Sequence, residues 1–506
     1  MRLLAVLALL TLPLGGVAPA RIGTACSLTS TTNGTLTLSC AGRQVTQPFP
    51  STVTAGPPPW PPPPSVPVQS GVYYIAPNGD DTKDGTTPAT AWYTLDHAIA
   101  RGNVVMMQPG TFAGDHFQST KWATPTGSSG YAVLMCNSTV LNCFVDGAQG
   151  SGSERSAIHV GAPYWAVIGV TATASCGQNC VGYCFSTNSH HVLFINVYAH
   201  DCIWSGASTT GDYVAYIGTA LYHNAFQNWA GGGGCPSNDS DITPTAFDTA
   251  AGPHKFYAAF FSMKSGSYDS CVDGHGLIFD SLDQNNYHSQ VVIEQCMMLG
   301  NATHGLHFFK SRPWTGPSQV FSCTFYGNHA FQRGGAGGGE VNLQESNGVT
   351  FNKNIMQATV ATQSGWNGTT TTSGKVYAIA SVYSWPNVIF TNNDYFGVNG
   401  QHYCDYSDAG GGCNRNSQYR PTFGAGNVNV DPQFVNPTIP ASPPDCSQAA
   451  TVTACFAPII AGFKAQNPAV VGMGYRPPGA CAPDPFWPTW VPVSLIPDGI
   501  VTKPCS

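Results

Sequence analysis

Two short patterns each occur twice near the middle of the chain, and this repetition restricts the possible folds more than any other feature. The segment HGLIFDS (275–281) returns as HGLHFFKS (304–311), and EQCMMLGN (294–301) returns as FSCTFYGN (321–328), 27 residues later. Repeats of this period, built from short apolar runs that end at Gly or Asn, are typical of a solenoid. Each repeat is then one coil, which buries its apolar face only when the next coil stacks on it.

Aligning these repeats predicts which residues stack on one another. One column is apolar and should point into the core: Ile293, Val320, Phe351 and Phe390. A second column falls at a turn, where Asn is favoured because its amide bonds neighbouring backbone and it tolerates left-handed conformations: Cys296, Cys323, Asn354 and Asn393. Because Cys296 and Cys323 would lie on adjacent coils, we expect a disulfide between them.

The N-terminal residues divide into three segments. Residues 1–20 have the charged start, apolar run and small-residue cleavage site of a signal peptide, so we expect a secreted, extracellular protein. Residues 21–47 alternate Thr or Ser with Leu around Asn33-Gly34, a strong type I′ turn signal, and predict a small hairpin unit. Residues 48–70 are rich in Pro and predict a stiff, extended linker.

Composition excludes some partners and predicts disulfides. Only 9% of residues are charged, the formal net charge is −7 and no basic patch is present, so nucleic acid is not an expected partner. No run beyond the signal peptide has the ~18 apolar residues that a membrane span needs. An even number of Cys, 18, in a secreted chain predicts disulfides, for which the short-range candidate pairs are Cys26–Cys40, Cys136–Cys143, Cys404–Cys413, Cys446–Cys455 and Cys481–Cys505.

The triplet Cys176, Cys180 and Cys184 has a spacing that metal sites also use. No closing Cys or His pair at zinc-site spacing follows it. Disulfides are therefore favoured over zinc for these residues.

Residues 71–477 carry a resemblance to a known family. The segment YYIAPNGDDTKDGTTPATAWYTLDHAI, followed by GNVVMMQPGTF, resembles the N-terminal cap of secreted right-handed parallel β-helix proteins of the pectate-lyase-like superfamily. NVNVDPQFVNP and QNPAVVGMG resemble their last coils and end segment, and DGHGLIFDSLD with VVIEQCMMLGNATHGLHFFKS is similar to a branch usually described only by its repeat.

This resemblance implies an all-β fold, a right-handed parallel β-helix over residues 71–477. It also implies a capping helix at Leu95–Ala100, which would cover the open end of the solenoid, where apolar core and unpaired strand edges are otherwise exposed. Residues 478–506 are rich in Pro and predict an irregular tail that a disulfide ties down.

Strand alternation predicts where chemistry could gather. If Leu306 and Phe308 fill the core, then His307 points outward, and Asp280 does so in the first copy of the pattern. Stacked coils are ~4.8 Å apart, so we expect Asp280, His307 and Lys310 to share one surface groove.

The resemblance implies a polysaccharide partner and favours a lyase. β-Helix pectate lyases use Lys or Arg to remove the proton next to a uronate carboxylate, and they bind calcium through acidic side chains. We therefore expect Lys310 as the base, with His307 and Arg312 as further catalytic candidates. The candidate ligands of Ca2+ are Asp273, Asp280, Asp283 and Glu294. The candidates for substrate binding are His304, His275 and Glu340.

Other functions remain open, because no complete pectate lyase site motif is present. A glycoside hydrolase on the same fold would need a pair of carboxylates, for which the candidates are Asp280, Asp283, Glu340 and Glu345. A transition-metal site would use His275, His304 and His307. A non-catalytic, glycan-binding surface solenoid would use the same Asp and Lys residues only as turn formers and edge guards. In each case we expect a monomer.

Overall fold

In the computed structural model the chain divides into two compact units, Met1–Pro59 and Trp60–Ser506, and each is described by itself. In the first unit the structure describes residues 26–30, 35–40 and 43–48. In the second it describes residues 71–95, 103–126, 130–138, 142–147, 156–173, 183–200, 202, 205–222, 224, 275–280, 290–301, 303–309, 318–328, 338–359, 376–384, 386–397, 400–405, 413, 420–439, 452–477, 479, 481, 482, 484, 487–496 and 501–504.

The first unit is a three-stranded antiparallel sheet. β1 (Cys26–Ser30) pairs with β2 (Thr35–Cys40), and β2 pairs with β3 (Arg43–Pro48). Cys26 lies opposite Cys40 in this register, although their side chains lie outside the described residues. The third strand was not expected from the sequence.

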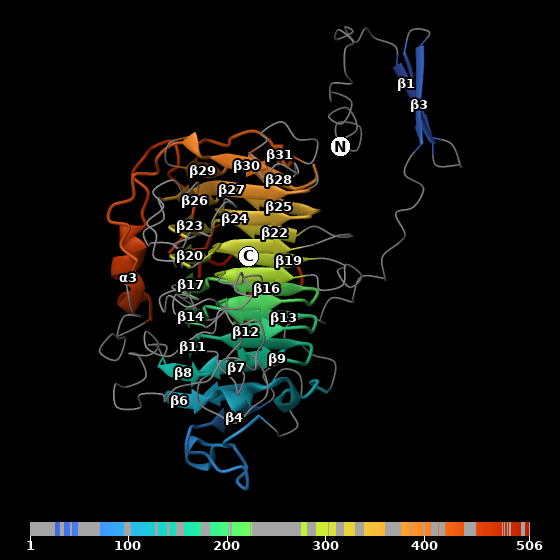
Figure 1. Cartoon of the computed structure of the whole chain (residues 1–506). Coiled ribbons are helices and arrows are strands. Elements are labelled where there is room, and N and C mark those ends of the chain that lie inside the picture. The colour runs from blue at the N-terminus through green and yellow to red at the C-terminus, as the bar shows by residue number, and fades with distance from the viewer. Residues whose placement is uncertain are drawn as a thin grey trace, which may run out of the picture. The chain divides into compact units, whose positions relative to one another are not determined.

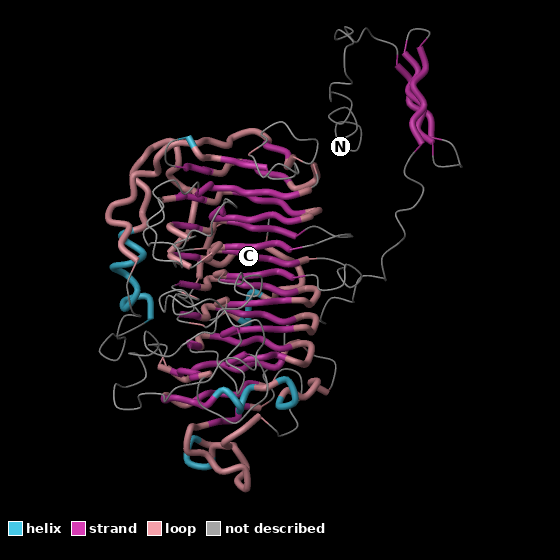
Figure 2. The backbone as a smooth tube through the Cα atoms, viewed as in Figure 1, coloured by secondary structure: helices cyan, strands magenta, loops and turns pink. Residues whose placement is uncertain are grey.

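The second unit is a parallel β-helix, as the repeat predicts (Figures 1 and 2). A complete coil contributes one strand to each of three sheets, the coils at the two ends contribute to fewer, and strands of successive coils pair in parallel. Sheet 1 comprises β4 (Val72–Ile75), β5 (Val104–Met107), β7 (Ala132–Cys136), β10 (Trp165–Ile168), β13 (Val192–Ile195), β16 (Val214–Ile217), β19 (Val291–Glu294), β22 (Ser318–Phe321), β25 (Val349–Asn352), β28 (Ile389–Thr391) and β31 (Thr422–Phe423).

The other two sheets complete the coils. Sheet 2 comprises β6 (Gly110–Ala113), β8 (Cys143–Asp146), β11 (Thr171–Thr173), β14 (Tyr198–His200), β17 (Ala220–Tyr222), β20 (Met297–Leu299), β23 (Thr324–Tyr326), β26 (Ile355–Ala358) and β29 (Asp394–Gly397). Sheet 3 comprises β9 (Ser156–Val160), β12 (Tyr183–Thr187), β15 (Ala207–Thr209), β18 (Leu277–Asp280), β21 (Leu306–Phe309), β24 (Gly338–Gln344), β27 (Val376–Val382) and β30 (Tyr403–Asp405).

The predicted core column is confirmed. Ile293, Val320, Phe351 and Phe390 pair in register on successive strands of sheet 1, and all four are fully buried. The rings of Phe351 and Phe390 stack with centroids 4.4 Å apart. In sheet 3, Leu306 and Phe308 also lie in the core, so the alternation predicted for that strand holds.

The predicted turn column forms a hydrogen-bonded ladder between sheets 1 and 2, here called the first ladder. The backbone N–H of each rung donates to the side chain of the next: Cys296 to Cys323 Sγ (3.3 Å), Cys323 to Asn354 Oδ1 (2.8 Å), Asn354 to Asn393 Oδ1 (2.9 Å) and Asn393 to Asn427 Oδ1 (2.9 Å). The left-handed residue is the one before each rung, such as Gln295 at φ 50°.

The predicted disulfide between Cys296 and Cys323 is wrong, because both residues are free and buried. The Sγ of Cys323 instead accepts the backbone N–H of Cys296, the role that Asn fills at the other rungs. The stacking prediction was correct, and only the bond inferred from it was not.

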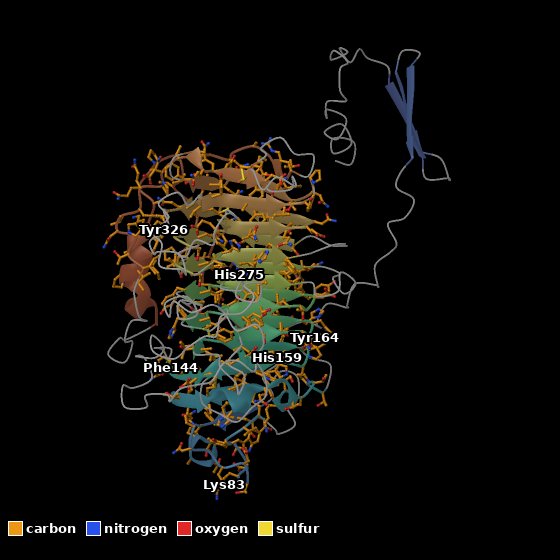
Figure 3. All side chains as sticks on the ribbon, in the orientation of Figure 1. Lys83, Phe144, His159, Tyr164, His275 and Tyr326 are labelled. Carbon is orange, nitrogen blue, oxygen red and sulfur yellow. A yellow bond between two sulfur atoms is a disulfide. The ribbon has the colours of Figure 1, made fainter. Side chains whose placement is uncertain are left out.

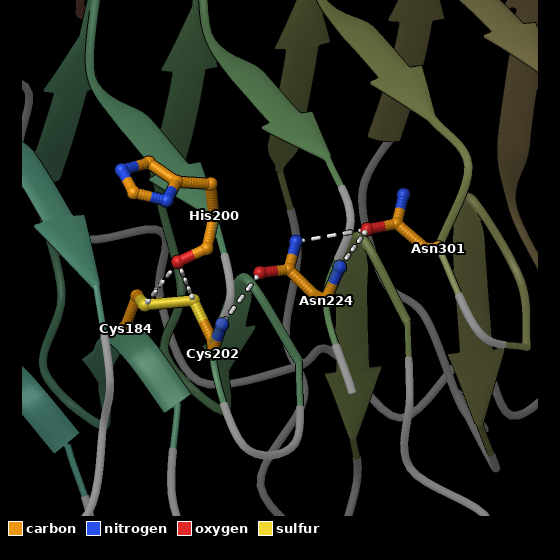
Figure 4. Close-up of a disulfide and its surroundings, with 5 residues drawn as sticks. All are labelled: Cys184, His200, Cys202, Asn224 and Asn301. Carbon is orange, nitrogen blue, oxygen red and sulfur yellow. Dashed lines mark hydrogen bonds between the residues drawn. A yellow bond between two sulfur atoms is a disulfide. The ribbon is translucent and has the colours of Figure 1, made fainter. Parts of the chain in front are cut away.

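A second ladder, not expected from the sequence, lies between sheets 2 and 3. It begins at Cys202, which is disulfide-bonded to Cys184, and its first rungs are drawn in Figure 4. Backbone N–H groups again donate to the next side chain: Cys202 to Asn224 (3.1 Å), Asn224 to Asn301 (3.3 Å), Asn301 to Asn328 (3.0 Å) and Asn328 to Glu340 (3.2 Å).

Segments that follow the solenoid in sequence cover two of its three outer faces. The described residues of 428–439 and 452–475, which include α3 (Val452–Gly462), pack apolar side chains on the outer face of sheet 2. Residues 487–496, which include a 3-10 turn at Val493–Leu495, pack Trp490 and Ile496 on sheet 1. Among the described residues, no comparable apolar cluster lies on the outer face of sheet 3.

Other predictions can be compared with the structure only in part. The disulfides Cys136–Cys143 and Cys404–Cys413 are confirmed. Cys481 is also disulfide-bonded, whereas Cys505, Cys446, Cys176 and Cys180 lie outside the described residues, as does the side chain of Cys455. Of the expected capping helix only Leu95 is described, and it is buried. Short 3-10 turns occur at Pro88–Thr90, Gly114–Phe117 and Ser119–Lys121. No described helix is long and apolar enough to cross a membrane.

Candidate active site

The outer face of sheet 3 holds a group of buried histidines on adjacent coils. His307 lies in β21 between the core residues Leu306 and Phe308, so alternation directs its side chain outward. His275 lies two residues before the neighbouring strand β18, and Figure 3 labels it on this sheet. Both imidazoles are almost inaccessible, with exposed fractions of 0% for His275 and 5% for His307.

Three side chains form a hydrogen-bonded chain, here called the imidazole chain. The hydroxyl of Thr303 lies 2.7 Å from Nδ1 of His275, and Nε2 of His275 lies 3.1 Å from Nδ1 of His307. The remaining nitrogen, Nε2 of His307, is buried and has no hydrogen-bond partner among the described residues. Within the part of the chain that the structure describes, the imidazole chain therefore ends at Nε2 of His307.

Burial lowers the pKa of His307 well below its ordinary value, and the neighbouring His275 lowers it further. His307 is therefore a neutral imidazole near pH 7, and its two nitrogens differ in role. If each ring carries its proton on Nδ1, His307 donates to His275, His275 donates to Thr303, and Nε2 of His307 presents a lone pair. The opposite order leaves a proton on Nε2, so the chain can take up or release a proton at this atom.

His304 packs against this chain without extending it. Its ring stacks on His275 with centroids 5.1 Å apart and planes 7° apart. Its Nδ1 lies 3.0 Å from the carbonyl oxygen of Gly339, and the Asn342 amide lies 3.2 Å from its Nε2. Both ring nitrogens are thus engaged, and His304 fixes the position of its neighbour. His275 and His304, predicted to bind substrate, are both buried and lie just before the strands β18 and β21.

The three imidazoles do not present a common centre for a metal. Among the described residues, no group of three or more His, Cys, Asp or Glu could hold a metal ion. The physical reason is that the ring nitrogens of His275 and His304 face protein partners. The transition-metal alternative therefore gains no support from this cluster.

Glu294, a predicted calcium ligand, lies away from the histidines. It belongs to β19 of sheet 1, and its Oε1 accepts from Gln295 at 3.1 Å and lies 3.5 Å from Arg476. Arg476 also contacts Asp484 at 2.9 Å. Burial, with the nearby Asp484, raises the pKa of Glu294 well above its ordinary value. This carboxyl group anchors the covering C-terminal segment, and the structure does not bring it to sheet 3.

Glu340, predicted to bind substrate, lies in β24 of sheet 3 but faces inward. Its Oε2 accepts the Asn328 amide at 2.6 Å and so ends the second ladder. Glu340 is fully buried, which raises its pKa well above the ordinary value. Its carboxyl group therefore faces the ladder and not the solvent.

The remaining predicted site residues lie wholly or partly outside the described residues. Lys310, Arg312, Asp273 and Asp283 lie outside the described residues. The backbone of Asp280 is described, in register with Phe309 one coil away, but its side chain is not. Thr303 was missed by sequence reasoning, although it directly precedes His304 in the second copy of the repeat.

No protein-family model matches the sequence, and no curated protein resembles it significantly. Solved structures similar to this chain include a pectate lyase, Pel9A, at 15% identity, with 71% of this chain and 78% of that chain covered and a TM-score of 0.40. An alginate lyase from Paenibacillus sp. str. FPU-7 is 13% identical, with coverages of 65% and 92% and a TM-score of 0.37. A rhamnogalacturonan lyase is 13% identical, with coverages of 73% and 91% and a TM-score of 0.37. At these values, a function has to be argued from the side chains of this chain.

Proposed function

We propose that this protein cleaves a uronate-containing polysaccharide by β-elimination on the outer face of sheet 3. The observation that carries the proposal is the buried, neutral His307, whose Nε2 has no hydrogen-bond partner among the described residues while Nδ1 is held by His275. A neutral imidazole fixed through one nitrogen is suited to general acid–base catalysis at the other.

In this reaction a base removes the proton on the carbon next to the uronate carboxylate. The electron pair of the broken C–H bond forms the C=C bond, and the glycosidic C–O bond breaks on the other side. The leaving oxygen takes up a proton. His307 is proposed for one of these proton transfers, because its ring can pass a proton through His275 toward Thr303 without accumulating charge.

The other transfer and the binding of the carboxylate need groups beyond the imidazole chain. Lys310, which follows β21 in sequence, is the candidate partner in proton transfer, and Arg312 is the candidate for holding the carboxylate. Calcium is a candidate cofactor, for which Asp273, Asp280 and Asp283 are the candidate ligands. The proton transfer proposed for His307 does not depend on it.

The test is an assay of the purified full chain against pectate, alginate and other uronate polysaccharides, read by the ultraviolet absorbance of the unsaturated product. His307→Gln should lower kcat at least 100-fold and leave glycan affinity nearly unchanged, since general acid–base groups contribute about 10²–10⁴-fold. The matched control is His402→Gln, because His402 is a partly buried histidine beside the last strand of the same sheet.

Full activity of His307→Gln would remove the imidazole chain from the mechanism. Glycan binding without unsaturated product from any uronate polymer would instead favour the non-catalytic solenoid. Hydrolysis without unsaturated product would favour the glycoside hydrolase.

A further inference from the structure

A second hydrogen-bonded chain lies on sheet 3, near its N-terminal end. His159 of β9 and Ser186 of β12 pair in register on adjacent coils, and both point outward, because their neighbours Ile158 and Phe185 fill the core. Figure 3 labels His159 on the same sheet as His275. Ser186 lies three strands from His307, a distance of about 14 Å at ~4.8 Å a strand.

Four side chains make up this group, here called the serine chain. The Ser156 hydroxyl lies 2.6 Å from Oγ of Ser186. Oγ of Ser186 lies 3.0 Å from Nδ1 of His159, and Nε2 of His159 lies 3.3 Å from Oδ1 of Asn188. Ser156 and Ser186 are buried, His159 is partly exposed and Asn188 is exposed, so the chain opens to solvent at its Asn188 end.

The direction of the hydrogen bonds follows from the acceptor at that end. Oδ1 of Asn188 can only accept, so Nε2 of His159 carries the proton. A neutral ring then has its lone pair on Nδ1, and Ser186 must donate its hydroxyl proton to it. The remaining lone pairs of Ser186 accept the Ser156 hydroxyl. This is the orientation of an activated nucleophile: a serine donating to a base that a third group orients.

From this arrangement we propose that the serine chain is a second catalytic site, which hydrolyses small acyl esters such as O-acetyl groups of a glycan. Oγ of Ser186 attacks the ester carbonyl, and its proton passes to Nδ1 of His159. The C–O bond to the alcohol breaks, and the alcohol leaves with that proton. Water then attacks the acyl–serine ester with His159 again accepting a proton, which releases the carboxylic acid and restores Ser186.

The roles within the chain differ. Ser186 and His159 touch the reacting atoms, and Asn188 is a positioning residue that fixes the ring. Ser156 donates to Ser186 Oγ and favours the developing negative charge there. Because Ser186 is only 6% exposed, the acyl group has to be small. This activity would not depend on the imidazole chain or on the elimination proposed above.

The experiment is labelling of the folded full chain with a small fluorophosphonate, located by peptide mass spectrometry, together with hydrolysis of p-nitrophenyl acetate. Label should appear on Ser186, and Ser186→Ala should abolish both label and turnover. His159→Gln should slow labelling at least 100-fold. Asn188→Ala should slow it about tenfold, and Asn188→Asp should restore it.

The matched control is Ser208→Ala. Ser208 follows Ser186 in the same row on the next coil and is equally buried, at 6% exposed. The Ser208→Ala variant should leave labelling of Ser186 unchanged. A thermal melt of each variant checks that it is folded. If Ser186→Ala does not fold, the labelling rates of the His159 and Asn188 variants test the proposal instead. Three results would overturn the proposal: label on a residue other than Ser186, an equal loss of labelling in Ser208→Ala, or an unchanged labelling rate in His159→Gln.

Discussion

Replacing Asn354 with Ala tests whether the first ladder stabilises the solenoid. Asn354 is fully buried and bonds two backbone groups of the preceding coil: its Oδ1 accepts the Cys323 N–H at 2.8 Å, and its Nδ2 donates to the Val320 carbonyl at 2.9 Å. Asn354→Ala removes both side-chain partners and leaves these groups buried.

The expected cost follows from counting these groups. An unsatisfied buried donor or acceptor costs about 1–3 kcal/mol, so two of them should lower the free energy of unfolding by about 2–6 kcal/mol. The backbone N–H of residue 354 keeps its acceptor, Oδ1 of Asn393, although the bond from Asn354 Nδ2 to that oxygen (2.9 Å) is lost. Most of the damage should therefore fall on the N-terminal side of the rung.

Cys323→Asn is the matched control at the adjacent rung. The Sγ of Cys323 lies 3.6 Å from the carbonyl oxygen of Ile293, where an Asn amide could donate as Asn354 does to Val320. We expect this variant to be as stable as the parent or more stable. The assays are urea unfolding and amide hydrogen exchange at Cys323, whose protection should fall only in Asn354→Ala. A loss below about 1 kcal/mol with unchanged exchange would refute the role assigned to the ladder.

Two further predictions concern residues of the coils that bond the segments following the solenoid. Burial raises the pKa of Asp394 to about 7, whereas the unfolded carboxyl keeps its ordinary value of 3.8, so stability should fall as pH rises from about 4 to 7. Asp394→Asn should flatten this dependence and raise the melting temperature at pH 8 but not at pH 4; the difference corresponds to roughly 4 kcal/mol at most, and an unchanged profile would contradict it. Gln295 bonds the N–H and the carbonyl oxygen of Thr502 at 3.0 and 2.8 Å. Gln295→Ala should therefore speed proteolysis within residues 487–504 without lowering urea stability of the coils, and equal digestion rates would show that this contact does not hold the segment.

Stacking between residues of matching repeats could be predicted from the sequence, whereas stacking across long insertions could not. Ile293 and Val320 are 27 residues apart in matching runs, so their stacking could be inferred. Asn224 and Asn301 are adjacent rungs of the second ladder, but 77 residues separate them, and no period connects them. The direction of His307 followed from strand alternation.

Side-chain contacts between coils could not be predicted in the same way. The bond from His275 to His307 joins different positions of two adjacent repeats, so no alignment column contains both. Ser186 and His159 lie in strands whose sequences share no motif, and only the register brings them together. Trp490 and Ile496 follow no periodicity, so their packing on sheet 1 had no sequence signal.

The covering segments have a consequence for biosynthesis. Trp490 accepts a hydrogen bond from Tyr131, which precedes it by 359 residues, so the first coils leave the ribosome long before the residues that cover them. During that interval the outer faces of sheets 1 and 2 are bare apolar surfaces, on which a chaperone or another nascent chain can bind. A chain cut short after residue 427 would have all its coils and neither cover. A chaperone should still bind such a product through its exposed apolar faces, although its coils are in register.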